Sequence, residues 1–197
     1  MANQTLVIAS ANAGKLEEFR QMLGPHGFEV KAQSAYGVDP PAETGKTFVE
    51  NALIKARVAA SASGQAALGD DSGLVVRALN GRPGIYSSRF AGGAASSDDN
   101  IDKLLAELEG MPDERRGAFF YCCLVLLQHA EDPAPLIATG RWHGYILDAR
   151  RGEAGFGYDP VFYDPDMGAS AAQLPGSEKN RVSHRGRALK ALLGQLD

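Results

Sequence analysis

Two adjacent carboxylates, Asp70 and Asp71, stand in an otherwise apolar and glycine-rich stretch of the chain. Neighbouring carboxylates repel one another unless a positive group neutralises them. A divalent cation is one such group, and Mg²⁺ prefers one or two protein carboxylates together with waters and substrate phosphates. Glu43, in a separate loop with Gly and Pro, is a candidate for a further oxygen ligand. A plain turn in which one Asp caps backbone N–H groups is the alternative, and the spacing leaves both open.

A second candidate site lies near the N-terminus, between a short apolar run and a segment of helical periodicity. It consists of Ser10, Ala11, Asn12, Ala13, Gly14 and Lys15. Backbone N–H groups, a helix N-terminus and the Lys15 ammonium would converge there on phosphate oxygens. It is not a P-loop, because Ala9 and Leu16 stand where that motif needs Gly and Ser or Thr. An ordinary strand-to-helix connection with a solvated lysine is the alternative.

The segment that follows Glu43 contains a capping box, Thr47 to Glu50, which predicts a helix over residues 47–62. Asn51 and Lys55 lie four residues apart and therefore on one polar face of that helix. Lys55 is a candidate phosphate ligand. Without further context, a solvated lysine is the usual role at such a position.

Aromatic and basic residues mark the last third of the chain. Phe156, Gly157, Tyr158 and Asp159 bring two rings and a carboxylate to the start of an expected strand. Stacking on a base and acceptance of a ring N–H are the functional interpretation, and aromatic core packing is the alternative.

Positive charge gathers around the start of the last helix, which is expected over residues 183–196. The basic side chains there are Lys179, His184, Arg185, Arg187 and Lys190. Because the N-terminus of a helix repels positive charge, this cluster favours an anionic partner. Phosphate donors, a metal site, a base platform and a second cationic group together indicate a nucleotide.

These residues need a scaffold, and the hydrophobic pattern predicts an alternation of strands and helices. Strands are expected at 5–9, 28–32, 118–128 and 137–144, and the segments on either side of Asp70 and Asp71 form a strand pair or one strand broken by a turn. Helices are expected at 16–23, 47–62, 98–109 and 183–196. The pattern predicts an α/β fold, with one unit of two lobes around a shared sheet over residues 1–197.

Composition narrows the classes of protein. Of the 197 residues, 44% are hydrophobic and 22% charged, which fits a folded globular chain. The formal net charge of −4 argues against nucleic acid or an anionic membrane surface as partner. Two adjacent cysteines and the absence of an export or membrane-spanning pattern predict a cytoplasmic protein. The 23 glycines are more than average, and several fall within the candidate sites.

The motifs, taken in order, resemble the inosine and xanthosine triphosphate pyrophosphatases, which remove non-standard purine nucleotides from the nucleotide pool. The resemblance covers nearly the whole chain. It rests on the segments 10–15, 43–52, 70–74, 84–89, 155–160 and 183–186. It implies a long mixed β-sheet with flanking helices, two lobes around a central substrate cleft, and a homodimer.

The resemblance also implies a role for each motif. Asp71 would be the catalytic acceptor and a Mg²⁺ ligand, with Glu43 as a further metal ligand. Glu43 follows Ala42, where some relatives have a second acidic residue, and would fill that role alone. Asp70 is expected to tune Asp71 by like-charge repulsion. The implied substrate contacts are residues 10–15, Asn51, Lys55, Ser72, Phe156, Gly157, Tyr158, Asp159, Lys179, His184 and Arg185.

The implied reaction is hydrolysis of the α–β phosphoanhydride of ITP, dITP, XTP and dXTP to nucleoside monophosphate and pyrophosphate. Donors near position 6 of the base would reject ATP, and a donor near position 2, from Arg185 or His184, would reject GTP. Two other functions stay open from the sequence. One is a nucleotide sensor without hydrolysis, and the other is a pyrophosphatase for modified pyrimidine nucleotides.

Overall fold

A computed structural model describes residues 4–196, and the expectation of one domain over 1–197 extends beyond them at both ends. The chain forms two compact units. Unit 1 contains the residues up to Ser72, then Cys122–Gly140, then the chain from Arg185, and unit 2 contains Gly73–Tyr121 and Arg141–His184. Within residues 4–196, seven strands form one sheet in the order β2-β1-β3-β4-β5-β6-β7. The strands β3 (Ala67–Val76), β4 (Gly117–Leu127) and β5 (Leu136–Ile146) each contribute residues to both units.

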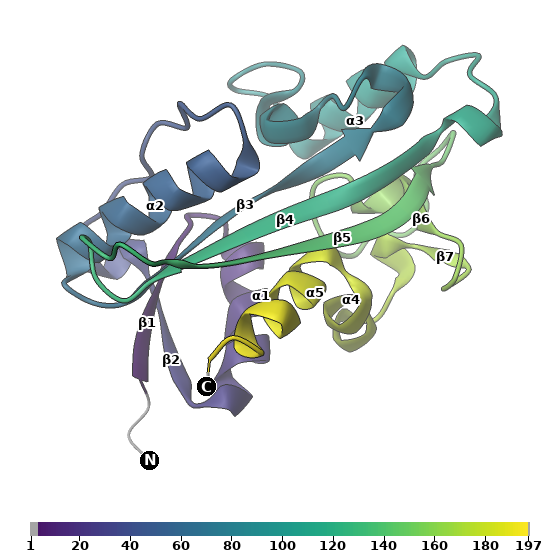
Figure 1. Ribbon diagram of the computed structural model, residues 1–197. Helices are drawn as coiled ribbons and strands as arrows, with labels where there is room; N and C mark the ends of the chain where they lie inside the picture. Colours follow the sequence, from purple (N-terminus) through teal and green to yellow (C-terminus); the bar gives the residue numbers. More distant parts are fainter. Residues whose placement is uncertain (1–3, 197) are drawn as a thin grey trace. The chain divides into compact units, whose positions relative to one another are not determined.

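Unit 1 is built on parallel strands. β1 (Gln4–Ala9) pairs in parallel with β2 (Phe28–Ala32) on one side and with β3 on the other. The helices of this unit are α1 (Ala13–Leu23), α2 (Phe48–Ser63) and α5 (His184–Leu193), and Figure 1 shows α2 across the strands from α1 and α5.

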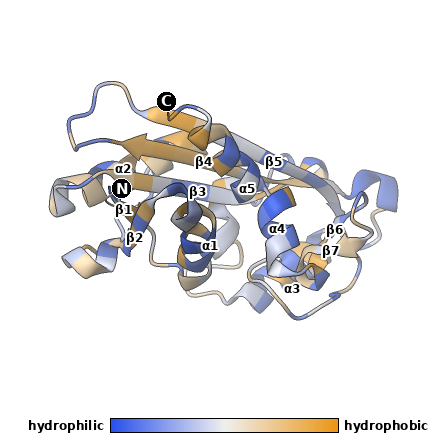
Figure 2. Cartoon of the chain, turned by 90° about the horizontal axis from the view of Figure 1, so that it is seen from below, coloured by the Kyte–Doolittle hydropathy of each residue, from blue (hydrophilic) through white to orange (hydrophobic). Residues whose placement is uncertain are grey.

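The alternation of side chains on β1 explains this layering. Leu6 and Ile8 pack in one cluster with α1 and α5, and Val7 and Ala9 pack in another with α2. Both faces of the strand are therefore covered, as a parallel sheet requires. The apolar second half of β4 is orange in Figure 2, and its side chains are buried.

Unit 2 has its own hydrophobic core. Its remaining strands are β6 (Phe162–Asp164) and β7 (Ala169–Ser170), and the pairs β5–β6 and β6–β7 are antiparallel. Its helices are α3 (Ser97–Glu107) and α4 (Gly176–Val182). Trp142 is fully buried in this core, where its ring contacts Phe120 and Phe162 and its Nε1–H donates to Asp164. Among residues 4–196, none of the helices has the length and apolar character needed to span a membrane.

The predicted mixed sheet with flanking helices is confirmed. Several details differ from expectation. β3 is one continuous strand that contains Asp70 and Asp71, with no polar turn. Helix α1 begins at Ala13 rather than at residue 16, and α4 was not predicted. Helix α4 has only seven residues, too few for a clear helical period in the sequence.

Candidate active site

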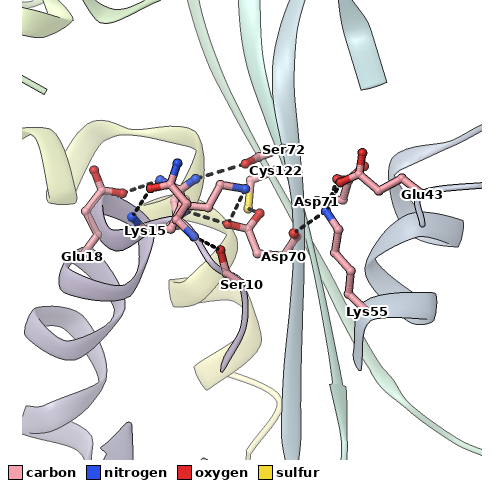
Figure 3. Close-up of polar contacts among 11 residues, drawn as sticks. Ser10, Lys15, Glu18, Glu43, Lys55, Asp70, Asp71, Ser72 and Cys122 are labelled. Carbon is pink, nitrogen blue, oxygen red and sulfur yellow. Dashed lines mark hydrogen bonds and ion pairs between the residues drawn. The ribbon is translucent and has the colours of Figure 1, made fainter. Parts of the chain in front are cut away.

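Asp70 and Asp71 are consecutive residues of β3, so their side chains point to opposite faces of the strand. The Asp70 carboxylate contacts Lys15 Nζ at 3.2 Å and Arg185 Nε at 3.0 Å, and the Cys122 thiol donates to it at 3.6 Å. Burial would raise the pKa of Asp70, but the charges of Lys15 and Arg185 hold it well below its ordinary value. Asp70 is therefore an ionised carboxylate between two cations (Figure 3).

Asp71 lies on the side of helix α2 (Figure 3). Its Oδ1 is 2.6 Å from Lys55 Nζ, and its Oδ2 accepts a hydrogen bond from Asn51 Nδ2 at 3.3 Å. Burial raises the pKa of Asp71, the nearby Glu43 charge adds to this effect, and Lys55 opposes it. A buried carboxylate with a raised pKa is suited to accept a proton from water.

The expectation that Asp70 tunes Asp71 by repulsion stays a prediction, and the geometry of the two side chains does not favour it. Asp70 is neutralised on its own side of the strand by Lys15 and Arg185. The carboxylate that raises the pKa of Asp71 is Glu43, from the loop before α2.

Glu43 and Asp71 share one cation. Lys55 Nζ lies 2.6 Å from Glu43 Oε1 and 2.6 Å from Asp71 Oδ1. Burial would lower the pKa of Lys55, but Asp71 and Glu43 outweigh that effect and raise it, so the ammonium stays charged. Lys55 is thus a half-buried partner of two acids rather than a solvated lysine.

The first turn of α2 holds the loop that contains Glu43. Asn51 Oδ1 accepts from the Gly45 N–H at 2.8 Å, and Glu50 Oε2 accepts from the Lys46 N–H at 2.8 Å. The Thr47 hydroxyl accepts from the Glu50 N–H, which confirms the capping arrangement at this helix.

The segment 10–15 forms the start of helix α1. Asn12 is the N-cap and accepts from the Lys15 N–H at 3.0 Å, and Ser10 Oγ accepts from the Asn12 N–H at 3.1 Å. Ala13, Gly14 and Lys15 therefore belong to the first helical turn, where N–H groups are free of intrahelical partners. Such a turn is suited to bind an anion, with Lys15 as a cation beside it.

Arg185, one of the expected substrate contacts, is fully buried in unit 1 at 1% exposure. It forms ion pairs with Asp70 and Glu18, and its Nη2 donates to Ser72 Oγ at 3.0 Å. The anionic partners expected near the start of the last helix therefore include two carboxylates of the chain itself. Sequence analysis missed Glu18. The available signal was its position on the helix that follows residues 10–12, one turn after Lys15.

In unit 2, Asp159 holds the glycine-rich motif together. Its Oδ2 accepts from Lys179 Nζ at 2.7 Å and from the Phe156 N–H at 2.8 Å. The Lys179 ammonium also lies 4.6 Å from the centre of the Phe156 ring, within the range of a cation–π contact. Gly157, which lies between Phe156 and Asp159 in the sequence, has a positive φ of 62°.

The other two expected contacts of unit 2 are packed against its core. The Tyr158 hydroxyl donates to the Ser87 carbonyl at 2.8 Å, and burial raises the pKa of Tyr158. The His184 ring stacks on Phe120, with 4.8 Å between ring centres and 15° between planes. Tyr158 thus contributes to the core, as the alternative interpretation held, whereas Phe156 is only half-buried.

Glu43 and Asp71 fit a divalent cation by the chemistry of their donor groups. Two carboxylates from separate segments already converge on one positive charge, that of Lys55. Among residues 4–196, no group of three or more His, Cys, Asp or Glu side chains is arranged to hold a metal ion. A site with two carboxylates suits Mg²⁺, which retains waters and takes phosphate oxygens from a substrate.

The chain is similar to known proteins along nearly its whole length. A profile described as the Ham1 family matches residues 6–195. The dITP/XTP pyrophosphatase of Methylococcus capsulatus (strain ATCC 33009 / NCIMB 11132 / Bath) is 56% identical over 191 residues, which cover 97% of this chain and 95% of that protein. The dITP/XTP pyrophosphatase of Yersinia pestis is 52% identical over 193 residues, which cover 98% of both chains.

Two solved structures are similar in fold and sequence. A HAM1 protein from Coxiella burnetii superposes with a TM-score of 0.90 at 47% identity, with 98% of each chain covered. The Ham1 protein of Staphylococcus aureus superposes with a TM-score of 0.85 at 40% identity, again with 98% of each chain covered.

Proposed function

The chain belongs to the Ham1 family, and on this premise we propose that it hydrolyses non-standard purine nucleoside triphosphates. The substrates are ITP, dITP, XTP and dXTP, and the products are the nucleoside monophosphate and pyrophosphate. The observation that supports this function best is the convergence of Glu43 and Asp71 on one cation. Such a pair of acids can hold a divalent cation. Phosphoanhydride hydrolysis benefits from that cation, because charge neutralisation and positioning dominate the chemistry.

Glu43 and Asp71 would hold the metal ion, which we propose to be Mg²⁺. When bound, the cation would neutralise phosphate charge and make the phosphorus easier to attack. The first turn of α1, with Asn12 and Lys15, would bind phosphate oxygens through N–H groups and the ammonium. Lys55 would remain beside both acids as a second positive charge.

Asp71 would act as the general base. Its carboxylate takes a proton from the attacking water as the water oxygen bonds to one phosphorus of the α–β anhydride. The bond from that phosphorus to the bridging oxygen breaks, and the bridging oxygen leaves with the other phosphate group.

The residues of the base side would be Phe156, Gly157, Tyr158, Asp159, Lys179, His184 and Arg185. Hypoxanthine and xanthine have an oxygen at position 6, whereas adenine has an amino group, so donors near this position would reject ATP. Guanine shares the oxygen and differs at position 2, where its amino group would face a donor. A site that leaves a buried polar group unpaired discriminates by about 10⁴ to 10⁵.

Release of pyrophosphate from a panel of nucleotides, with and without Mg²⁺, tests this function. We expect turnover of ITP, dITP, XTP and dXTP, and little turnover of ATP, GTP or modified pyrimidine nucleotides. The Asp71→Asn variant is the matched control for contaminating phosphatases. Binding of ITP without release of pyrophosphate would instead identify a sensor, and turnover of pyrimidines alone would identify a different pyrophosphatase.

Two further expectations belong to this proposal. We expect a homodimer, which light scattering coupled to size-exclusion chromatography would measure. We also expect the protein to work in the cytoplasm, where its substrates arise, and fractionation of cells that express it would test this.

A further inference from the structure

Asn51 is a buried amide that connects two separate segments of unit 1. Its side chain lies on α2 and is 0% exposed. Its Oδ1 accepts from the Gly45 N–H at 2.8 Å, and its Nδ2 donates to Asp71 Oδ2 at 3.3 Å. One partner is two residues after Glu43, and the other is Asp71 itself.

The orientation of this amide is set by its partners. The Gly45 N–H is only a donor, and an ionised Asp71 carboxylate is only an acceptor, so a flipped amide would lose both hydrogen bonds. Asn51 therefore fixes Asp71 Oδ2. The other oxygen of Asp71, Oδ1, is the one that contacts Lys55.

The hydrogen bond between Asn51 and Gly45 lies in a closely packed region. A Cβ atom added to Gly45 would lie 2.6 Å from Asn51 Oδ1 and 2.6 Å from Glu50 Cβ. The backbone at Gly45 can approach α2 this closely only because it has no side chain. Asn51 thus connects the Glu43 loop to Asp71 directly, alongside the ion pairs of Lys55 with both acids.

We propose that Asn51 is a positioning residue, which keeps Glu43 and Asp71 in the arrangement where their carboxylates share one cation. This inference rests on the proposed function for the identity of that cation as a divalent metal. It differs from a substrate contact, because both polar atoms of the Asn51 side chain have protein partners. Hydrogen-bond partners of metal ligands typically change metal affinity about 10- to 100-fold when they are removed.

Binding of Mn²⁺ without nucleotide tests the proposal, with free Mn²⁺ measured by electron paramagnetic resonance. Asn51→Leu removes both hydrogen bonds at similar volume, and Gly45→Ala disturbs the bridge from the loop side without a change at Asp71. We expect the Mn²⁺ dissociation constant to rise about 10- to 100-fold in Asn51→Leu, and to rise in Gly45→Ala as well. Glu50→Gln is the control, because Gln keeps an oxygen that can accept from the Lys46 N–H and the change removes no hydrogen bond of Asn51 or Asp71.

The outcomes separate the explanations. A lower melting temperature in both variants with an unchanged Mn²⁺ dissociation constant would mean a purely structural role, and would overturn the proposal. Wild-type protein that binds no Mn²⁺ at millimolar concentration would overturn it too. If Asn51→Leu does not fold, Gly45→Ala decides alone. Wild-type protein that binds Mn²⁺ in an Asn51-dependent way but releases no pyrophosphate from ITP would refute the proposed function and leave this inference in place.

Discussion

Asp70 and Asp71 are adjacent on β3, yet each has its own lysine on its own side of the strand. Asp70 pairs with Lys15 at 3.2 Å, and Asp71 pairs with Lys55 at 2.6 Å (Figure 3). The pKa of Asp70 is lowered by its cations, and the pKa of Asp71 is raised by burial. The two carboxylates are therefore suited to different tasks, Asp70 to structure and Asp71 to proton transfer.

Replacement of Asp71 by Asn is expected to abolish turnover without a loss of stability. Loss of a general base costs about 10² to 10⁴ in rate, and loss of a metal ligand adds to this. Because burial raises the pKa of Asp71, the folded state disfavours its charge, and a neutral Asn should fit at no cost. Pyrophosphate release and urea denaturation measure the two effects. Near-normal activity would refute the assignment of Asp71 as the base.

Replacement of Asp70 by Asn is expected to lower the free energy of unfolding, in contrast to Asp71→Asn. Removal of one charge from a buried ion pair typically lowers the free energy of unfolding by about 3 to 5 kcal/mol. We expect roughly 3 kcal/mol here, because Arg185 keeps its ion pair with Glu18. Urea denaturation at neutral pH gives the value. Glu178→Gln, in an exposed pair with Arg181, is the control and should change stability by less than about 1 kcal/mol. Equal effects of the two substitutions would contradict a structural role for Asp70.

The sequence was sufficient to predict most of the elements of unit 1, and the reasons are physical. Alternating and helical periods reflect burial, so β1, β2, α2 and β4 were expected close to where they lie. Side-chain partners across long separations have no such local signal. Arg185 and Asp70 are 115 residues apart, and nothing between them predicts their contact. Asp70 and Asp71 point to opposite faces of β3 because the strand runs through both residues without a turn, and the sequence did not predict that continuity.

Cys123 gives a pH-dependent test of packing in unit 1. Burial, with a smaller effect of Asp70, raises the pKa of the Cys123 thiol from its ordinary value of 9.0 to about 11. The folded thiol should therefore be about one thousandth ionised at pH 8 and react slowly with iodoacetamide.

The same shift affects stability. Above pH 9.0 the unfolded thiol loses its proton and the folded thiol retains it, so the free energy of unfolding should fall as the pH rises. Labelling rates followed by mass spectrometry check the first expectation. A free energy of unfolding that does not fall between pH 9 and pH 11 would contradict the raised pKa.

Gly155→Ala tests the arrangement around Asp159 in unit 2. Gly155 has a φ of +81°, and an added Cβ would lie 2.1 Å from Asp159 Oδ2, the atom that binds Lys179. Gly157→Ala is a matched control, since its φ is +62° but an added Cβ meets nothing within 4 Å. Both variants bear the backbone strain of about 1 to 2 kcal/mol, and only the first displaces the carboxylate. We expect the KM for ITP to rise about tenfold more in Gly155→Ala, and equal KM values would refute a role of Asp159 in the substrate site.

Substitutions of His184 and Arg185 test the proposed selection against guanine. If either side chain donates near position 2 of the base, its loss should raise kcat/KM for GTP relative to ITP by about tenfold or more, the value of one buried hydrogen bond. His184→Ala removes the ring that stacks on Phe120, and Arg185→Lys retains a charge beside Asp70 and Glu18 while it loses the guanidinium fork. Kinetics with ITP, XTP and GTP give the ratios for each variant. Unchanged discrimination in both would exclude these residues and direct the search to the backbone donors of the Phe156 motif.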